Sequence, residues 1–179
     1  HESGSGINTG SGNSLVGKHS GDSLTSSSYN VAMGWYSLAG ATANTENNVS
    51  IGAGAMKDGN GGDNNTAMGY NSLQANTTAN NNIAIGLDSL CVNQTGLKNV
   101  AMGTDTLRNN TGGCNTAIGY LSLAANTSAS NNTSVGACSL NANSTGACNT
   151  ALGHSALCTN TTGCINVAVG FNAMKANTT

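Results

Sequence analysis

The chain has 179 residues, a formal net charge of −2, 25 Gly, no Pro and only 7% charged residues. Its five Lys and Arg residues cannot form the dense basic face that binds nucleic acid, and no apolar run approaches the roughly 20 residues of a membrane span. Because large core residues are scarce, while charge and Pro are too rare for typical disorder, we expect a regular structure that pairs its own backbone.

Residues 1–12 precede the first repeat and are expected to form an N-terminal cap or a partial coil. Residues 13–179 are expected to form a single repeat array, because a Gly recurs every 16 to 18 residues and an Asn stands four residues before it. The glycines are Gly17, Gly34, Gly52, Gly69, Gly86, Gly103, Gly119, Gly136, Gly153 and Gly170. The asparagines are Asn13, Asn30, Asn48, Asn65, Asn82, Asn99, Asn115, Asn132, Asn149 and Asn166.

The three residues between each Asn and its Gly are expected to form a short strand. The last is always aliphatic or Met, the first is mostly β-branched, and a small residue separates them. This alternation places large side chains on one face and small ones on the other. We expect the β-branched column, which contains Thr66, Thr116, Thr133 and Thr150, to face inward.

The small residues at the centre of each predicted strand form a column of their own. Such a column would suit the close approach of a neighbouring chain, and it would equally suit a tight turn inside a monomer. Its alanines are Ala32, Ala67, Ala84, Ala101, Ala117, Ala151 and Ala168.

The segment after each Gly is predicted to form a second short strand. From the second repeat on, the fourth residue after the Gly is Leu or Met, and the rest of the unit is rich in the turn formers Asn, Thr and Gly. A unit of about 17 residues is too short for two packed helices. The predicted fold is therefore all-β, a parallel β-solenoid or β-roll of about ten coils with two short strands per coil. Coils stacked about 4.8 Å apart would make a rod of roughly 50 Å.

The asparagine column is interpreted as a structural device. In stacked coils, each Asn can hydrogen-bond the Asn above and below it, as in the ladders of cross-β assemblies. Because such a ladder uses up the donors and acceptors of the amides, we do not expect these residues to bind a ligand.

Two units show the repeat most clearly. Residues 115–123 read Asn-Thr-Ala-Ile-Gly-Tyr-Leu-Ser-Leu, and residues 166–174 read Asn-Val-Ala-Val-Gly-Phe-Asn-Ala-Met. They resemble the head repeats of trimeric autotransporter adhesins and similar repeats of phage and viral tail fibres, in which Asn-x-Ala-Ile-Gly units build left-handed β-rolls. The resemblance extends from about Asn13 to Asn177. It implies a surface-fibre role and a homotrimer, although the adhesin repeats are shorter and lack Cys.

Six cysteines lie between residues 91 and 164, and an even set suggests disulfides rather than metal. No Cys-x-x-Cys pair is present, so no metal site is predicted. Fifteen pairings are possible, and positions that flank the loops favour three of them. These are Cys158 with Cys164, Cys138 with Cys148, and Cys91 with Cys114.

Acceptor triplets for N-glycosylation recur in register in the loops. They are candidate sites for sugars along one edge of the rod, although Asn-Thr is also ordinary loop chemistry. The candidates are Asn76, Asn93, Asn126, Asn143, Asn160 and Asn177.

Four of the six aromatic residues directly follow a repeat Gly, namely Trp35, Tyr70, Tyr120 and Phe171. If they are exposed they can anchor a glycan or a protein partner, whereas buried rings would cap the core at a corner.

No constellation of catalytic residues converges, so the chain is not expected to be an enzyme or to need a cofactor. Residues 58–63 resemble a single Gly-rich calcium loop, but the pattern occurs once and a loop variant is the preferred interpretation. Residues 1–105 carry a net −4 and residues 106–179 a net +2. This asymmetry, with an open last coil, suggests head-to-tail stacking.

The sequence therefore predicts a structural subunit of an extracellular fibre or filament, or an adhesin head, secreted to a cell or virion surface. Its expected partners are copies of itself, as a homotrimer or a head-to-tail filament, and a host surface or glycan. The alternative is a surface-binding solenoid that recognises ice or glycans. Membrane insertion and nucleic-acid binding are not expected.

Overall fold

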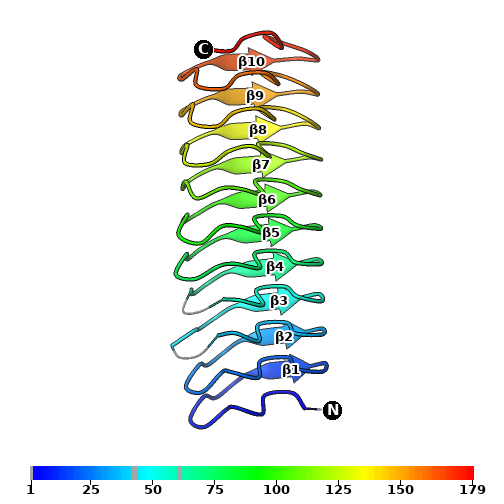
Figure 1. The fold of residues 1–179 in the computed structure, drawn as a ribbon, viewed down its shortest axis with the longest axis vertical. Helices are drawn as coiled ribbons and strands as arrows, with labels where there is room; N and C mark the ends of the chain where they lie inside the picture. The colour runs from blue at the N-terminus through cyan, green and yellow to red at the C-terminus, as the bar shows by residue number, and fades with distance from the viewer. Residues whose placement is uncertain (1, 42–43, 60–61) are drawn as a thin grey trace.

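The computed structural model describes residues 2–41, 44–59 and 62–179, which wind into a stack of flat coils with the two ends of the chain at opposite ends of the stack (Figure 1). Each coil contributes one three-residue strand. The strands are β1 (Ser14–Val16), β2 (Val31–Met33), β3 (Val49–Ile51), β4 (Thr66–Met68), β5 (Ile83–Ile85), β6 (Val100–Met102), β7 (Thr116–Ile118), β8 (Thr133–Val135), β9 (Thr150–Leu152) and β10 (Val167–Val169).

The ten strands form one parallel sheet in the order in which they occur in the chain. Equivalent repeat positions pair throughout, as when Thr116 lies beside Thr133 and Ile118 beside Val135. No helix occurs in the three described stretches. The all-β parallel solenoid with a repeat of about 17 residues is thus confirmed.

The second strand predicted in each coil is wrong, because the described chain contains one strand per coil. The segment after each Gly forms consecutive turns instead, and we call it the turn wall. Its central Leu has a left-handed backbone, with φ of 51° at Leu73 and 50° at Leu90, which is incompatible with an extended strand. Neighbouring turn walls are nevertheless hydrogen-bonded, for example from Leu73 N–H to Ser89 O at 2.9 Å.

The core is a single layer between the sheet and the turn wall. The small residue at the centre of each strand points inward, so that Ala101 is completely buried, and the Leu column of the turn wall, including Leu107, meets it from the other side. Since leucines fill the narrow interior, the sheet can contribute only small side chains. The prediction that the β-branched column faces inward is therefore wrong, and the residues that flank each Ala point outward.

The first coil reverses this arrangement. Leu15 takes the inward position that Ala or Ser holds in the other strands, and Gly21 stands where later coils have Leu or Met. A Cβ added to Gly21 would lie 2.8 Å from Leu15 Cδ2 and 2.8 Å from Leu24 Cδ1. The large side chain thus enters from the sheet, and a glycine on the opposite wall makes room for it.

The repeat glycine forms the bend between the two walls. At Gly86, φ is +129°, and a Cβ would lie 2.4 Å from the carbonyl oxygen of Gly103 in the next coil. A side chain is excluded by the backbone conformation and by the close stacking of coils. This explains why the position is Gly in every repeat.

Candidate functional site

The outer side of the sheet, which we call the sheet face, is a regular surface that runs over all ten strands. It carries the first and third residues of all ten strands, none of which is charged. Exposure is substantial even for large apolar side chains, with 42% for Met33, 37% for Ile118 and 69% for Val167. The threonines predicted to lie inside, including Thr133, are partly exposed on this face.

The first asparagine column stacks inside the rod, along the entry to each strand. In every successive pair, the side-chain Oδ1 of one Asn accepts a hydrogen bond from the backbone N–H of the next Asn, as from Asn99 N–H to Asn82 Oδ1 at 2.9 Å. The dominant contact is therefore amide oxygen to backbone, and not amide to amide. Its role is to hold the rungs in register.

The residues predicted as glycosylation sites form a second buried asparagine column. Asn76, Asn93, Asn126, Asn143 and Asn160 have no exposed surface. Here the amides do contact each other, as from Asn160 Nδ2 to Asn143 Oδ1 at 2.9 Å and from Asn177 Nδ2 to Asn160 Oδ1 at 3.0 Å. A glycan is attached through Nδ2, the atom that makes these bonds. The structure therefore favours the loop interpretation of these triplets over the glycosylation interpretation.

In five coils the two asparagine columns converge on a shared backbone carbonyl. Ala129 O accepts from Asn115 Nδ2 at 2.9 Å and from Asn126 Nδ2 at 3.0 Å. Gly146 O is held in the same way by Asn132 and Asn143. The loop thus obtains its order from buried amides, which explains how a chain with so few large apolar residues stays folded.

The six cysteines are free thiols, so the three predicted pairings receive no support. Each predicted pair is separated by a loop that contains a fully buried Asn, such as Asn160 between Cys158 and Cys164. Repeat positions explain why stacking does not bring cysteines together either. Cys91 and Cys158 share a column four coils apart, Cys114 and Cys148 share another two coils apart, and Cys138 and Cys164 occupy columns of their own.

Cys91 has the most perturbed thiol. Partial burial, and then the carboxylate of Asp88, raise its pKa, against the opposing effect of Arg108. Its Sγ lies 3.5 Å from Gln74 Oε1. A raised pKa disfavours the nucleophilic thiolate, so this environment does not resemble that of a catalytic cysteine.

All four predicted aromatic candidates are exposed. The exposed fractions are 57% for Trp35, 55% for Tyr70, 54% for Tyr120 and 75% for Phe171. They lie at the start of the turn wall, where side chains point away from the core. Of the two alternatives, capping the core at a corner is thus excluded in this structure.

Sequence reasoning missed a cluster around the first of these aromatic residues. The ring of Tyr36 stacks on His19 at 4.6 Å, and Trp35 meets Tyr36 edge to face at 4.8 Å. Lys57 Nζ lies 5.5 Å from the Tyr36 centroid, and Asp22 Oδ2 lies 2.6 Å from His19 Nδ1. The signal that could have found it is the shared repeat position of His19 and Tyr36, each of which is the second residue after a repeat Gly in successive coils.

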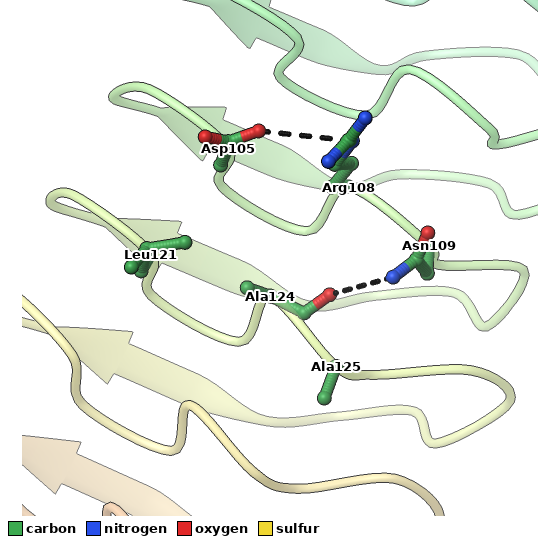
Figure 2. Close-up of a pocket in the computed structure, with 6 residues that line it drawn as sticks. All are labelled: Asp105, Arg108, Asn109, Leu121, Ala124 and Ala125. Carbon is green, nitrogen blue, oxygen red and sulfur yellow. Dashed lines mark hydrogen bonds and ion pairs between the residues drawn. The ribbon is translucent and has the colours of Figure 1, made fainter.

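A shallow hollow of about 230 Å³ lies on the outside of the turn wall, between the coils that follow β6 and β7 (Figure 2). Asp105 and Arg108 line one side, with Arg108 Nε 3.7 Å from Asp105 Oδ1, and Asn109 Nδ2 reaches Ala124 O at 3.4 Å. The hollow exists because Ala124 and Ala125 are small beside the longer side chains of the preceding coil. It contains no buried, unpaired polar atom, and its chemistry suggests no particular ligand.

The titratable residues do not assemble into a reactive site. Within residues 2–41, 44–59 and 62–179, no group of three or more His, Cys, Asp or Glu side chains is placed to hold a metal ion. His154 stacks on Phe171 at 5.4 Å, far along the rod from His19. Of the residues 58–63 considered as a calcium loop, Asn60 and Gly61 lie outside the described residues.

Among the described residues, no helix is long and apolar enough to cross a membrane. Comparison with protein-family models, with curated proteins and with solved structures found no match to this chain. The candidate site therefore rests on the geometry of the rod itself, with the sheet face as its main element and the aromatic edge as a second element.

Proposed function

We propose that the chain is a structural subunit of an extracellular fibre or filament, or an adhesin head, in which copies associate side by side through the sheet face. The observation that carries the proposal is the uncharged, largely apolar character of this face over ten rungs. Apolar surface that runs the length of a rod is costly to leave in water, and another copy would cover it along its whole length.

Regular stacking supports an interface between identical chains. Each coil presents the same two outward positions at the same height spacing, so that two or three parallel rods can meet rung by rung. Around a three-fold axis the sheet faces would enclose a shared apolar seam, which is consistent with the resemblance to adhesin heads. Head-to-tail stacking of such bundles would extend them into a filament.

The outward surface also suits a role outside the cell. Charge is sparse, and the backbone is secured by hydrogen bonds that do not depend on a bound cofactor. We assign no catalytic role to the chain. Exposed thiols at Cys114, Cys148 and Cys164 are available for links between chains in an oxidising compartment.

The proposal is tested by placing charge on the sheet face. In the double variant Thr133→Lys/Val135→Lys, two ammonium groups would enter an apolar seam, and we expect association to fall at least about tenfold, equivalent to about 1.4 kcal/mol. Sedimentation and multi-angle light scattering measure the assembly state. The matched control, Asn109→Lys/Thr145→Lys, adds the same charge to exposed positions away from the sheet face and should leave assembly unchanged. A wild-type chain that is monomeric at high concentration would rule the proposal out.

A second candidate is an ice-binding face, and one observation favours it. Thr116, Thr133 and Thr150 occupy three consecutive rungs and point outward, in register. Regular hydroxyl and methyl groups on a flat face can order water. Thermal hysteresis and inhibition of ice recrystallisation, lost in Thr133→Lys, would support this function, whereas a wild-type protein without either activity would eliminate it.

A further inference from the structure

The surroundings of Trp35 differ from those of the other exposed aromatic residues. Tyr36 is stacked on His19 and lies under Lys57, and the edge-to-face contact with Tyr36 fixes the orientation of the Trp35 indole. The indole is nevertheless 57% exposed. A large ring is therefore held rigidly at the surface while much of it faces water.

The next coil has small residues at the repeat positions that Trp35 and Tyr36 occupy. Ala53 and Gly54 follow its repeat Gly, and Gly54 N–H donates to Trp35 O at 2.9 Å. One coil further, Asn71 N–H donates to Ala53 O at 3.1 Å, which places Tyr70 two rungs from Trp35. At the usual rung spacing, the backbones that carry the two rings are about 9.6 Å apart.

Polar groups border this pair of rings. A Cβ on Gly54 would lie 2.4 Å from Asn71 Oδ1, so the Asn71 amide extends over the small coil. Lys57 supplies an ammonium group beside Tyr36. The flanking groups are thus one cation and one amide, next to two exposed aromatic faces.

We propose that Trp35 and Tyr70, with Asn71 and Lys57, form a carbohydrate-binding site across the small coil of Ala53 and Gly54. A pyranose ring has apolar C–H faces, which stack on aromatic rings, and a rim of hydroxyl groups, which need both donors and acceptors. The amide of Asn71 supplies both, and the ammonium of Lys57 donates. Two platforms two rungs apart would hold neighbouring or alternate sugars of one chain.

The occupant is inferred to be a sugar and not a second copy of the rod because of the polar groups. The sheet face, assigned above to self-association, carries no charge, whereas the Trp35 cluster includes Lys57, Asp22 and His19. Burying these groups against an apolar partner would be unfavourable. The site does not depend on the proposed assembly and would be present in a single chain.

Trp35 is the only Trp and so reports directly on its own site. The protein is titrated with cellotetraose, tetra-N-acetylchitotetraose and mannotetraose while indole emission is recorded. We expect at least one sugar to give a saturable shift or quench. Tyr70→Ala should weaken binding about tenfold through loss of one stacking platform, and Ala53→Leu should abolish it by filling the space between the rings.

The matched control is Tyr120→Ala. Tyr120 occupies the same repeat position with the same exposure, but its neighbours in that column are Thr104 and Ala137, and its variant should bind as the wild type does. Circular dichroism verifies that each variant is folded. Absence of a saturable response to all three sugars, or equal loss of binding in Tyr120→Ala, would overturn the proposal. So would an emission shift that follows protein concentration without sugar, because another copy would then cover Trp35.

Discussion

The sheet and the turn wall solve the same packing problem in opposite ways. The sheet turns its small residues inward and its large residues outward, whereas the turn wall sends Leu inward and carries variable residues outside. One wall supplies the volume of the core and the other supplies a flat surface. In so thin a rod the core needs one large side chain per coil, and the wall that does not provide it is free to form a functional surface.

Exchanging the large residue of the turn wall and the small residue of the sheet in one coil should have the largest effect on stability. Leu107→Gly removes the large residue of the turn wall and should lower the free energy of unfolding by about 3–5 kcal/mol, while Ala101→Leu overfills the sheet side at a cost of about 1–3 kcal/mol. The double variant reproduces the Leu15 and Gly21 pair of the first coil, so its cost should be clearly below the sum. Chemical denaturation of all four proteins measures the coupling. Strict additivity would show that the walls do not share one space.

The buried amides that join the walls should give the next largest effect. Asn99→Ala leaves Asn115 N–H without a partner and removes one of the two donors to Gly112 O, which keeps its bond from Asn110 Nδ2. It should cost about 2–4 kcal/mol, since a buried unpaired group costs about 1–3 kcal/mol and a lost hydrogen bond about 1 kcal/mol. Because coils contact only their neighbours, unfolding is expected to separate into two transitions. Hydrogen exchange of the amides on either side locates the break.

Two controls sharpen that measurement. Asn99→Asp keeps an oxygen that accepts from Asn115 N–H but replaces the Nδ2 donor with a second carboxylate oxygen facing Gly112 O, so at neutral pH it adds the cost of a buried charge and should destabilise the rod at least as much as Asn99→Ala. Asn109→Ala removes an exposed amide from the turn wall and should change stability by less than about 0.5 kcal/mol. Equal costs for Asn99→Ala and Asn109→Ala would contradict the role assigned to the ladder.

N-glycosylation of the loops tests whether the second asparagine column is buried. Because Asn126 is fully buried and its Nδ2 bonds to Ala129 O, the folded chain should resist N-glycosylation there, and Asn126→Gln should lower stability by about 1–3 kcal/mol. Mass spectrometry of protein secreted from a glycosylating host measures occupancy. Full occupancy at Asn126 in a folded, undamaged rod would contradict this arrangement.

The smallest effect is expected on the outside of the sheet. Thr133→Lys, alone or with Val135→Lys, should change the free energy of unfolding of an isolated chain by less than about 0.5 kcal/mol, since both side chains point outward. Denaturation at low protein concentration measures the free energy of unfolding of the single chain without any contribution from assembly. A loss of several kcal/mol would place these side chains inside.

One part of the candidate site could be predicted from the sequence, and another part could not. Repetition alone identified the aromatic column, because four aromatic residues directly follow a repeat Gly, whereas the exposure of their rings came only from the structure. The cluster of His19, Tyr36 and Lys57 could not be found by searching for motifs in sequence order. Its members lie on three successive coils, and only stacking in register brings them together.

The sequence by itself determined the period, the parallel sheet and the register of the asparagine column, because each follows from a residue type recurring at one spacing. Only the tertiary structure decided which side of each strand faces inward. Alternation separates large from small residues but does not assign a face, and the assignment depends on Leu73 and its equivalents filling the interior from the opposite wall. The second asparagine column was hidden for a similar reason, since an Asn-Thr loop has the same sequence whether its amide points to water or to the amide of the next coil.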